Sequence, residues 1–286
     1  MLRARPTATL AAALAALARP RAVAVGAAVG VAPAPSRALA QVPDNHCWKC
    51  NHYDPTSTFF CKNASCSVIL PTPDPAPNFF DLLQLDLPGA PFTPGGPAAS
   101  SQAGGDANAG TDADAQASPR HAAILRHGFT VSAPTVKRAF LSLQQRLHPD
   151  NFSTKSDQER TISETSSMLV NRAYQTLRDP LSRAMYILDL HGITVPETPS
   201  AADRDVLLHV VQALEEIEDA DLHADPDAIK DLVASNARRI EGEHRVIADA
   251  FARNEPEVAR DAIVRLKYWR NIAAAADEKL GVSSDA

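Results

Sequence analysis

The chain has 286 residues, of which 45% are apolar and 22% are charged, a balance typical of water-soluble globular proteins with one or two domains. Its formal net charge of −6 argues against a nucleic-acid-binding surface, which is usually basic. All four cysteines fall between Cys47 and Cys66, so they indicate one local site rather than a disulfide framework spread through a secreted fold.

The amino-terminal segment has the composition of a targeting signal. Residues 1–43 contain no acidic residue but have arginine at positions 3, 5, 19, 21 and 37, set among Ala, Leu and Val. We expect residues 1–40 to be a transit peptide that directs import into the mitochondrial matrix. A secretory signal is the alternative, because residues 10–18 form an apolar run. The uncharged run 22–36 is too short to span a bilayer, so we expect no membrane insertion.

The cysteines form two close pairs, Cys47-Trp48-Lys49-Cys50 and, ten residues later, Cys61 with Cys66. Two such pairs on short turns can place four thiolates around one tetrahedral ion, which predicts a structural zinc module over residues 44–70. We expect the aromatic residues of this segment to cover the site. His46 and His52 are near enough to replace one ligand. A thiol oxidoreductase built on the first pair is the alternative reading.

A proline-rich segment separates these cysteines from the next expected helix. Every second residue of 71–77 is proline, which predicts a stiff linker. Asn78 suits the N-cap of a short apolar helix over 78–85. Residues 88–119 consist mainly of Gly, Pro, Ala, Ser, Asp and Gln, which is too polar for ordered packing. We interpret this stretch as an insertion within the domain that follows.

Two amphipathic helices are expected on either side of a short proline-containing turn. Ser132 and Pro134 predict the start of the first helix, and Pro149 its end. Ser156 with Glu159 predicts a capping box at the start of the second. The expected buried faces are Val136, Phe140, Leu143 and Leu147 in the first helix and Ile162, Thr165, Leu169, Ala173 and Leu177 in the second. The short turn predicts an antiparallel hairpin.

The turn itself, His148-Pro149-Asp150, makes this hairpin resemble a J domain. The sequence over 171–184 and 190–193 is similar to the HscB family, the J-protein co-chaperones of iron–sulfur cluster assembly. The resemblance covers roughly residues 47–280. It implies an all-α, L-shaped fold with a J domain over 78–193 and a carboxy-terminal three-helix bundle over 200–281, preceded by the zinc module.

The family's J domain implies a partner rather than a reaction. In J proteins this loop engages a 70 kDa heat-shock chaperone and speeds its ATP hydrolysis, so the resemblance makes His148, Pro149 and Asp150 chaperone-binding residues. Lys137, Arg138 and Arg146 would add a basic face. The resemblance implies a co-chaperone and not an enzyme. The chain has no phosphate-binding glycine loop, so we expect no bound nucleotide. Many family members carry Lys or Arg where this chain has Asn151, which predicts a weaker chaperone contact.

Three further helices are expected after the J domain. They should begin at Ser200 or Asp203, at Asp225-Pro226 and at Glu255-Pro256. The stripe of the last helix steps mostly by three or four residues, as in a bundle seam, and consists of Val258, Ala262, Leu266, Trp269, Ala273, Ala276 and Leu280.

The resemblance implies that this bundle binds an IscU-type iron–sulfur cluster scaffold. The scaffold-binding residues would be Leu207, Leu208, Val211 and Tyr268. Leu207 and Val211 also belong to the apolar stripe and fit a core role equally well. Leu208 and Tyr268 lie off their stripes, so we expect them to be exposed. A general protein-folding J protein with a zinc-dependent client-binding module is the alternative function.

Overall fold

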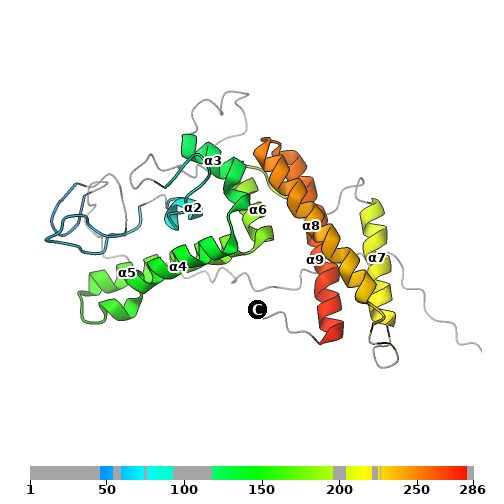
Figure 1. Cartoon of the computed structure of the whole chain (residues 1–286). Coiled ribbons are helices and arrows are strands. Elements are labelled where there is room, and N and C mark those ends of the chain that lie inside the picture. The colour runs from blue at the N-terminus through cyan, green and yellow to red at the C-terminus, as the bar shows by residue number, and fades with distance from the viewer. Residues whose placement is uncertain are drawn as a thin grey trace, which may run out of the picture. The chain divides into compact units, whose positions relative to one another are not determined.

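The computed structural model describes residues 46–53, 59–73, 76–92, 118–195, 204–220, 225 and 227–281 (Figure 1). Within these residues the regular structure consists of helices and three isolated β-bridges, which confirms the all-α prediction. The expected transit peptide at 1–40 lies outside the described residues, as does most of the insertion expected at 88–119.

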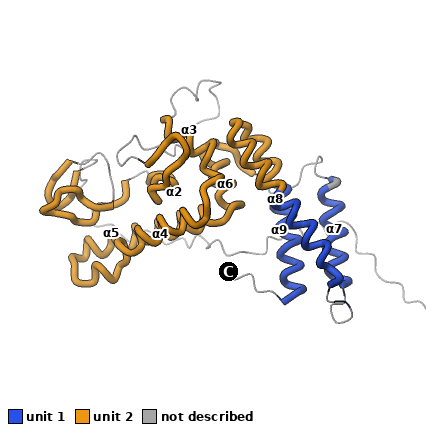
Figure 2. The backbone as a smooth tube through the Cα atoms, in the orientation of Figure 1, with its two compact units in different colours: residues 1–39, 196–241, 264–286 blue, residues 40–195, 242–263 orange. Residues whose placement is uncertain are grey.

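The chain divides into two compact units (Figure 2). Among the described residues, the first comprises 46–195 and 242–263, and we call it the J unit. The second comprises 204–241 and 264–281, and we call it the bundle unit. Helices α8 (Lys230–Ala252) and α9 (Pro256–Leu280) contribute residues to both units.

The expected hairpin is present in the J unit. Helices α4 (Ala133–Leu147) and α5 (Asp157–Arg178) pack against each other along their length. Ser132 caps α4 by accepting a hydrogen bond from the Thr135 amide, and the capping box of α5 is complete. The Phe140 and Tyr174 rings stack across the hairpin with centroids 4.2 Å apart. These contacts confirm the predicted helix starts and their pairing.

The buried face of α5 differs from the predicted stripe. Thr165 is exposed, and its hydroxyl donates to the Thr161 carbonyl of its own helix. The helix instead buries Ile162, Ser163, Ser166, Ser167, Val170, Ala173 and Leu177. Two of these serines bond to α4: Ser163 donates to the Leu147 carbonyl, and Ser167 accepts from the Gln144 side chain. The predicted stripe consisted mainly of apolar residues and left out these serines, because serine occurs on buried and exposed helix faces alike.

Two short helices precede the hairpin. Helix α2 (Phe79–Leu82) is capped by Asn78, as expected, but ends earlier than residue 85. Helix α3 (Pro119–His127) was not predicted, and Ser118 caps it with Pro119 in its first turn. Arg120 of α3 pairs with Asp81 of α2 and donates to the Leu85 and Ala90 carbonyls. The two ends of the expected insertion are therefore held together by one guanidinium group.

Helix α6 (Pro180–Leu190) ties these elements to the hairpin. Arg183 is buried and donates hydrogen bonds to the backbone carbonyls of Leu177, Phe129 and Val131. The Tyr186 hydroxyl accepts a hydrogen bond from the Phe79 amide at 2.9 Å, and the two rings stack with centroids 4.5 Å apart. At Gly128, a Cβ atom would lie 2.7 Å from the Phe80 ring, so the close packing there requires glycine.

The bundle unit contains α7 (Arg204–Asp219) and parts of α8 and α9. Its buried core consists of Val210, Ala213, Ile217, Ile229, Trp269, Ile272 and Ala276. Asn236 is also buried and donates to the Trp269 carbonyl at 2.8 Å, which joins α8 to α9.

Three details of these last helices correct the sequence expectations. Helix α8 begins at Lys230, not at Asp225-Pro226, because Asp225 instead accepts from the amides of Asp227 and Ala228 in a preceding turn. Val258 and Leu280 were expected in the seam of α9 but are 47% and 40% exposed. They lie near the two ends of the helix, where fewer neighbours can cover a side chain.

Candidate functional site

The His-Pro-Asp loop forms a short turn directly after α4. Residues Pro149–Phe152 make one 3₁₀ turn, closed by a hydrogen bond from the Asn151 amide to the His148 carbonyl. The Nδ1 atom of His148 accepts from the Asp150 amide at 3.3 Å and lies 3.4 Å from the Asp150 carboxylate. The two side chains are nevertheless 50% and 90% exposed. The loop therefore offers both polar side chains to a partner on an ordered backbone.

Residues outside the tripeptide hold this backbone in place. Ser163 of α5 is fully buried and donates to the carbonyl of Leu147, the last residue of α4, at 2.7 Å. Phe152 is buried and anchors the other end of the turn. The sequence reading missed Ser163, because a buried serine in a helix is not distinguishable by type from an exposed one. Its signal is its position among apolar residues of the α5 face.

Asn151 has a structural role at the place where many family members carry a cation. Its side-chain amide donates to the Gln145 carbonyl in the last turn of α4 at 2.9 Å. Helix C-termini leave such carbonyls without an intrahelical partner. Asn151 therefore stabilises the junction between helix and loop, although it brings no positive charge.

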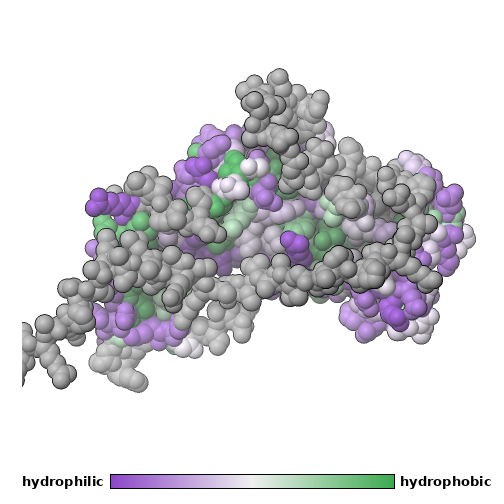
Figure 3. All heavy atoms as spheres, turned by 180° about the vertical axis from the view of Figure 1, so that it is seen from behind, coloured by the Kyte–Doolittle hydropathy of each residue, from purple (hydrophilic) through white to green (hydrophobic). Residues whose placement is uncertain are grey.

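The predicted basic residues of α4 are all exposed. Lys137 and Arg138 lie in the first half of the helix, whereas Arg146 lies in its last turn. The guanidinium carbon of Arg146 sits 4.4 Å from the centroid of the Phe60 ring, at cation–π distance. The space-filling view shows a predominantly hydrophilic surface at the loop end of the hairpin (Figure 3). This end of the J unit therefore suits a polar partner.

The cysteines are held by two similar turns. In the first turn the Cys47 amide donates a hydrogen bond to the His52 carbonyl. In the second the Cys61 amide donates to the Val68 carbonyl, and both distances are 2.9 Å. The residues that follow the second cysteine of each pair, Asn51 and Ser67, have φ values of 56° and 45°. This left-handed conformation reverses the chain and aims both thiols of a pair at the same point.

The four sulfur atoms converge as a metal site requires. All lie within 4.8 Å of one another, with 3.9 Å between Cys47 and Cys66 and 3.7 Å between Cys50 and Cys61. A tetrahedral ion with metal–sulfur bonds of about 2.3 Å separates its ligands by about 3.8 Å. A disulfide needs a sulfur–sulfur distance of about 2.0 Å, and all four cysteines are free. The four cysteines can therefore hold one metal ion.

The pKa values of these thiols are also consistent with binding of a metal cation. Burial, together with the neighbouring thiols Cys50 and Cys47, raises the pKa of Cys61 to about 12. A backbone hydrogen bond from His52 lowers the pKa of Cys50 to about 7. Four thiolates gathered in this small space repel one another, and a bound dication removes that repulsion. Asn63 adds an amide donor 3.7 Å from the Cys50 sulfur, as outer-shell residues of metal sites do.

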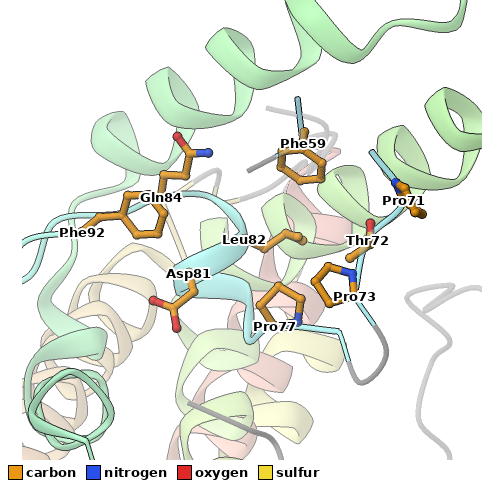
Figure 4. Close-up of a pocket in the computed structure, with 9 residues that line it drawn as sticks. All are labelled: Phe59, Pro71, Thr72, Pro73, Pro77, Asp81, Leu82, Gln84 and Phe92. Atoms are coloured by element: carbon orange, nitrogen blue, oxygen red, sulfur yellow. The ribbon is translucent and has the colours of Figure 1, made fainter. Parts of the chain in front are cut away.

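The expected aromatic cover of the site is only partly present. Trp48 packs against the cysteine cluster, and its indole donates to the Ile69 carbonyl at 2.8 Å. Phe59 instead lines a small pocket with Pro71, Pro73, Pro77 and Leu82 of α2 (Figure 4). Phe60 lies under Arg146. These two rings therefore contact parts of the J unit outside the cysteine turns, Phe59 at α2 and Phe60 at α4.

The four residues predicted to bind a scaffold lie in the bundle unit with different exposures. Leu208 is 46% exposed, as expected for a residue off the apolar stripe. Tyr268 was also expected to be exposed but is half-buried and packs against the bundle core. Its contact with the core places it at the border of the buried face of α9. Leu207 and Val211 are half-buried.

None of the described helices has an apolar stretch long enough to cross a membrane.

Comparisons with known proteins all point to one family. A family model described as "HSCB C-terminal oligomerisation domain" matches residues 202–277. The human "Iron-sulfur cluster co-chaperone protein HscB" is 34% identical over 145 residues, which cover 50% of this chain and 60% of that protein. The mouse protein of the same name is 27% identical over 241 residues, covering 83% of this chain and 82% of the relative.

A bacterial relative and a solved structure extend the match over most of their own lengths. The "Co-chaperone protein HscB homolog" of Vibrio cholerae is 35% identical over 144 residues, covering 49% of this chain and 83% of that protein. The crystal structure of human HscB matches with a TM-score of 0.59 and 26% identity, covering 84% of this chain and 98% of the other. The chain therefore belongs to the HscB family, whose members are co-chaperones and not enzymes.

Proposed function

We propose that this chain is a J-domain co-chaperone that stimulates the ATPase of a mitochondrial 70 kDa heat-shock chaperone and delivers an IscU-type iron–sulfur cluster scaffold to it. The observation that carries the proposal is the His-Pro-Asp loop, which has exposed polar side chains on a hydrogen-bonded turn. The names of the human and mouse relatives, iron–sulfur cluster co-chaperones, support the choice of cargo.

The two partners would bind different parts of the chain. His148, Pro149 and Asp150 would contact the chaperone, with Lys137 and Arg138 providing a basic face for an acidic surface. The bundle unit would bind the scaffold through an apolar patch centred on Leu208. A protein that binds both at once raises the local concentration of scaffold at the chaperone.

The metal of the four-cysteine site would be structural zinc. Four thiolates fill the tetrahedral positions that zinc prefers and leave no open position for a substrate. The segment buries only a small cluster around Cys47, Cys61 and Val68, so metal binding would supply much of its stability. Metal analysis of the purified protein should give one zinc per chain, and a protein without zinc would contradict this assignment.

Residues 1–40 would direct the protein to the mitochondrial matrix, because their arginine-rich and acid-free composition is that of a transit peptide. A fluorescent protein fused after residue 43 would test this. Mitochondrial fluorescence is expected, and secretion of the fusion would contradict it.

The test of the loop is a steady-state ATPase assay with the purified mitochondrial chaperone. His148→Gln should remove stimulation, because it removes the exposed imidazole that the loop would offer to the chaperone. His127→Gln, at the end of α3 and outside the loop, is the matched control and should stimulate like the wild type. Full stimulation by His148→Gln, with the helical circular dichroism unchanged, would contradict the proposal.

A further inference from the structure

The four-cysteine segment, which comprises residues 46–53 and 59–70, contacts the α4–α5 hairpin beside the His-Pro-Asp loop. Arg146 lies two residues before His148, and its guanidinium group is stacked on Phe60. Phe60 is adjacent to Cys61, and it pairs with Ile69 through an isolated β-bridge. A hydrogen bond from the Leu70 amide to the Phe59 carbonyl closes the same pairing. The position of the Phe60 ring therefore depends on the turn that holds the second cysteine pair.

The first cysteine turn lies near the start of α5, the helix that follows the loop. Lys49 lies between Cys47 and Cys50, whereas Glu159 lies in the first turn of α5, after the loop. Burial raises the pKa of Glu159, but hydrogen bonds from Ser156 and the positive charges of Lys49 and Lys155 outweigh it and lower that pKa. The four-cysteine segment thus faces the last turn of α4 and the first turn of α5. In Figure 1 it lies near the loop end of this hairpin.

We propose that Phe60 couples the four-cysteine segment to the His-Pro-Asp loop by holding Arg146, so that metal binding determines how the loop is presented to the chaperone. This inference rests on the proposed function of the loop. Arg146 then acts as a positioning residue, held by its own chain, rather than only as a charge that contacts the partner. The segment without metal lacks a core large enough to fix Phe60.

The coupling adjusts the loop and does not create it. Ser163 and Phe152 hold the loop backbone from within the hairpin, independently of the cysteines. Loss of metal should therefore weaken chaperone stimulation without abolishing it. A planar guanidinium stacked on an aromatic ring is worth about 0.5–2 kcal/mol, which corresponds to a change of about 2- to 30-fold.

A double-mutant cycle on the full-length, zinc-loaded protein tests the contact. Phe60→Ala and Arg146→Ala should each raise the concentration for half-maximal ATPase stimulation by about 3- to 10-fold. The double variant should be no worse than the more affected single variant, because both remove the same contact. Phe60→Trp should restore the wild-type value, since an indole face also binds a guanidinium group. Tyr53→Ala removes an exposed aromatic side chain of the same segment and is the matched control.

Amide hydrogen exchange of residues 144–152 provides a readout that needs no chaperone. Chelation of the metal should speed exchange in this stretch of the wild type by about tenfold, but should add little in Phe60→Ala, where the contact is already lost. The inference is overturned if Phe60→Ala behaves like Tyr53→Ala, if the two single effects multiply in the double variant, or if chelation leaves exchange unchanged. A wild type that does not stimulate the chaperone contradicts the proposed function, while the exchange experiment still decides the coupling.

Discussion

The hydroxyl of Ser163 donates to the backbone carbonyl of Leu147 at 2.7 Å, and this one bond joins α5 to the residue that precedes the His-Pro-Asp loop. Both residues are fully buried. The helix that follows the loop therefore fixes the residue directly before it, so the orientation of His148 depends on how α4 and α5 pack.

Ser163→Ala should lower the free energy of unfolding by about 1–2 kcal/mol. The Leu147 carbonyl would lose a donor in a place that water cannot easily reach, although alanine favours the helix slightly. Urea denaturation followed by circular dichroism measures the change. The control is Thr161→Ala, which removes an exposed hydroxyl bonded within the same helix. Equal stabilities for the two variants would mean that the Ser163 bond contributes nothing to the loop's support.

Arg183→Ala should be the most destabilising of these substitutions, at about 3–4 kcal/mol. Burial lowers the pKa of this guanidinium group, with Asp179 partly opposing the shift, and three carbonyls depend on it for a donor. The stability of Arg183→Lys should lie between those of Arg183→Ala and the wild type, because one ammonium group cannot donate to all three carbonyls. Denaturant titration gives the values. Arg178→Ala, an exposed position at the end of α5, should cost less than about 1 kcal/mol; a similar loss there would argue against a special role for Arg183.

Tyr186 makes stability depend on pH in the alkaline range. Burial raises the pKa of its phenol to about 12 from an ordinary value near 10. Because the folded state holds this proton more tightly, the contribution is complete below pH 10 and is lost as the pH rises towards 12. Two pKa units correspond to about 2–3 kcal/mol.

Tyr186→Phe should remove this part of the pH dependence. At neutral pH the variant should lose about 1 kcal/mol, since the Phe79 amide loses its acceptor. Thermal unfolding at pH 9 and pH 11 compares the two proteins: the wild type should lose more of its melting temperature over this interval than the variant. An identical loss in both would show that Tyr186 keeps an ordinary pKa.

Leu208 and Tyr268 should respond differently to truncation. Leu208→Ala should weaken binding of an IscU-type scaffold by about 1–3 kcal/mol with little change in stability, because the side chain is 46% exposed. Tyr268→Ala should reduce both scaffold affinity and the stability of the protein, since Tyr268 packs on the bundle core. Calorimetric titration gives the affinity, and Leu280→Ala, exposed at the end of α9, is the control. Unchanged affinity in Leu208→Ala would place the scaffold surface elsewhere.

The sequence predicted best what is decided locally. Ser132, and Ser156 with Glu159, mark helix starts through hydrogen bonds to backbone groups three residues away. Pro149 ends a helix because it has no amide hydrogen to donate. These roles follow from residue type and spacing. The cysteine site could also be predicted from the sequence, because each pair needs only its own turn to bring two sulfur atoms together.

The parts that were missed depend on distant neighbours. Helix α3 follows a long polar stretch and owes its place to Arg120, which reaches Asp81 and two carbonyls that are 30 or more residues away. The buried serines of α5 and the half-buried Tyr268 depend on which helix lies opposite. The contact of Phe60 with Arg146 joins segments separated by the whole insertion, and no periodicity in the sequence reveals it.

The central claim is that one chain brings the chaperone and the scaffold together. The most direct measurement is the steady-state ATPase of the mitochondrial 70 kDa chaperone with this protein, beginning at residue 41, in the presence and absence of the IscU-type scaffold. The account predicts stimulation by the protein alone, a further rise with scaffold, and loss of that further rise in Leu208→Ala. Stimulation that is indifferent to scaffold would contradict the delivery of a specific cargo and favour a general folding co-chaperone. No stimulation under either condition would contradict the account as a whole.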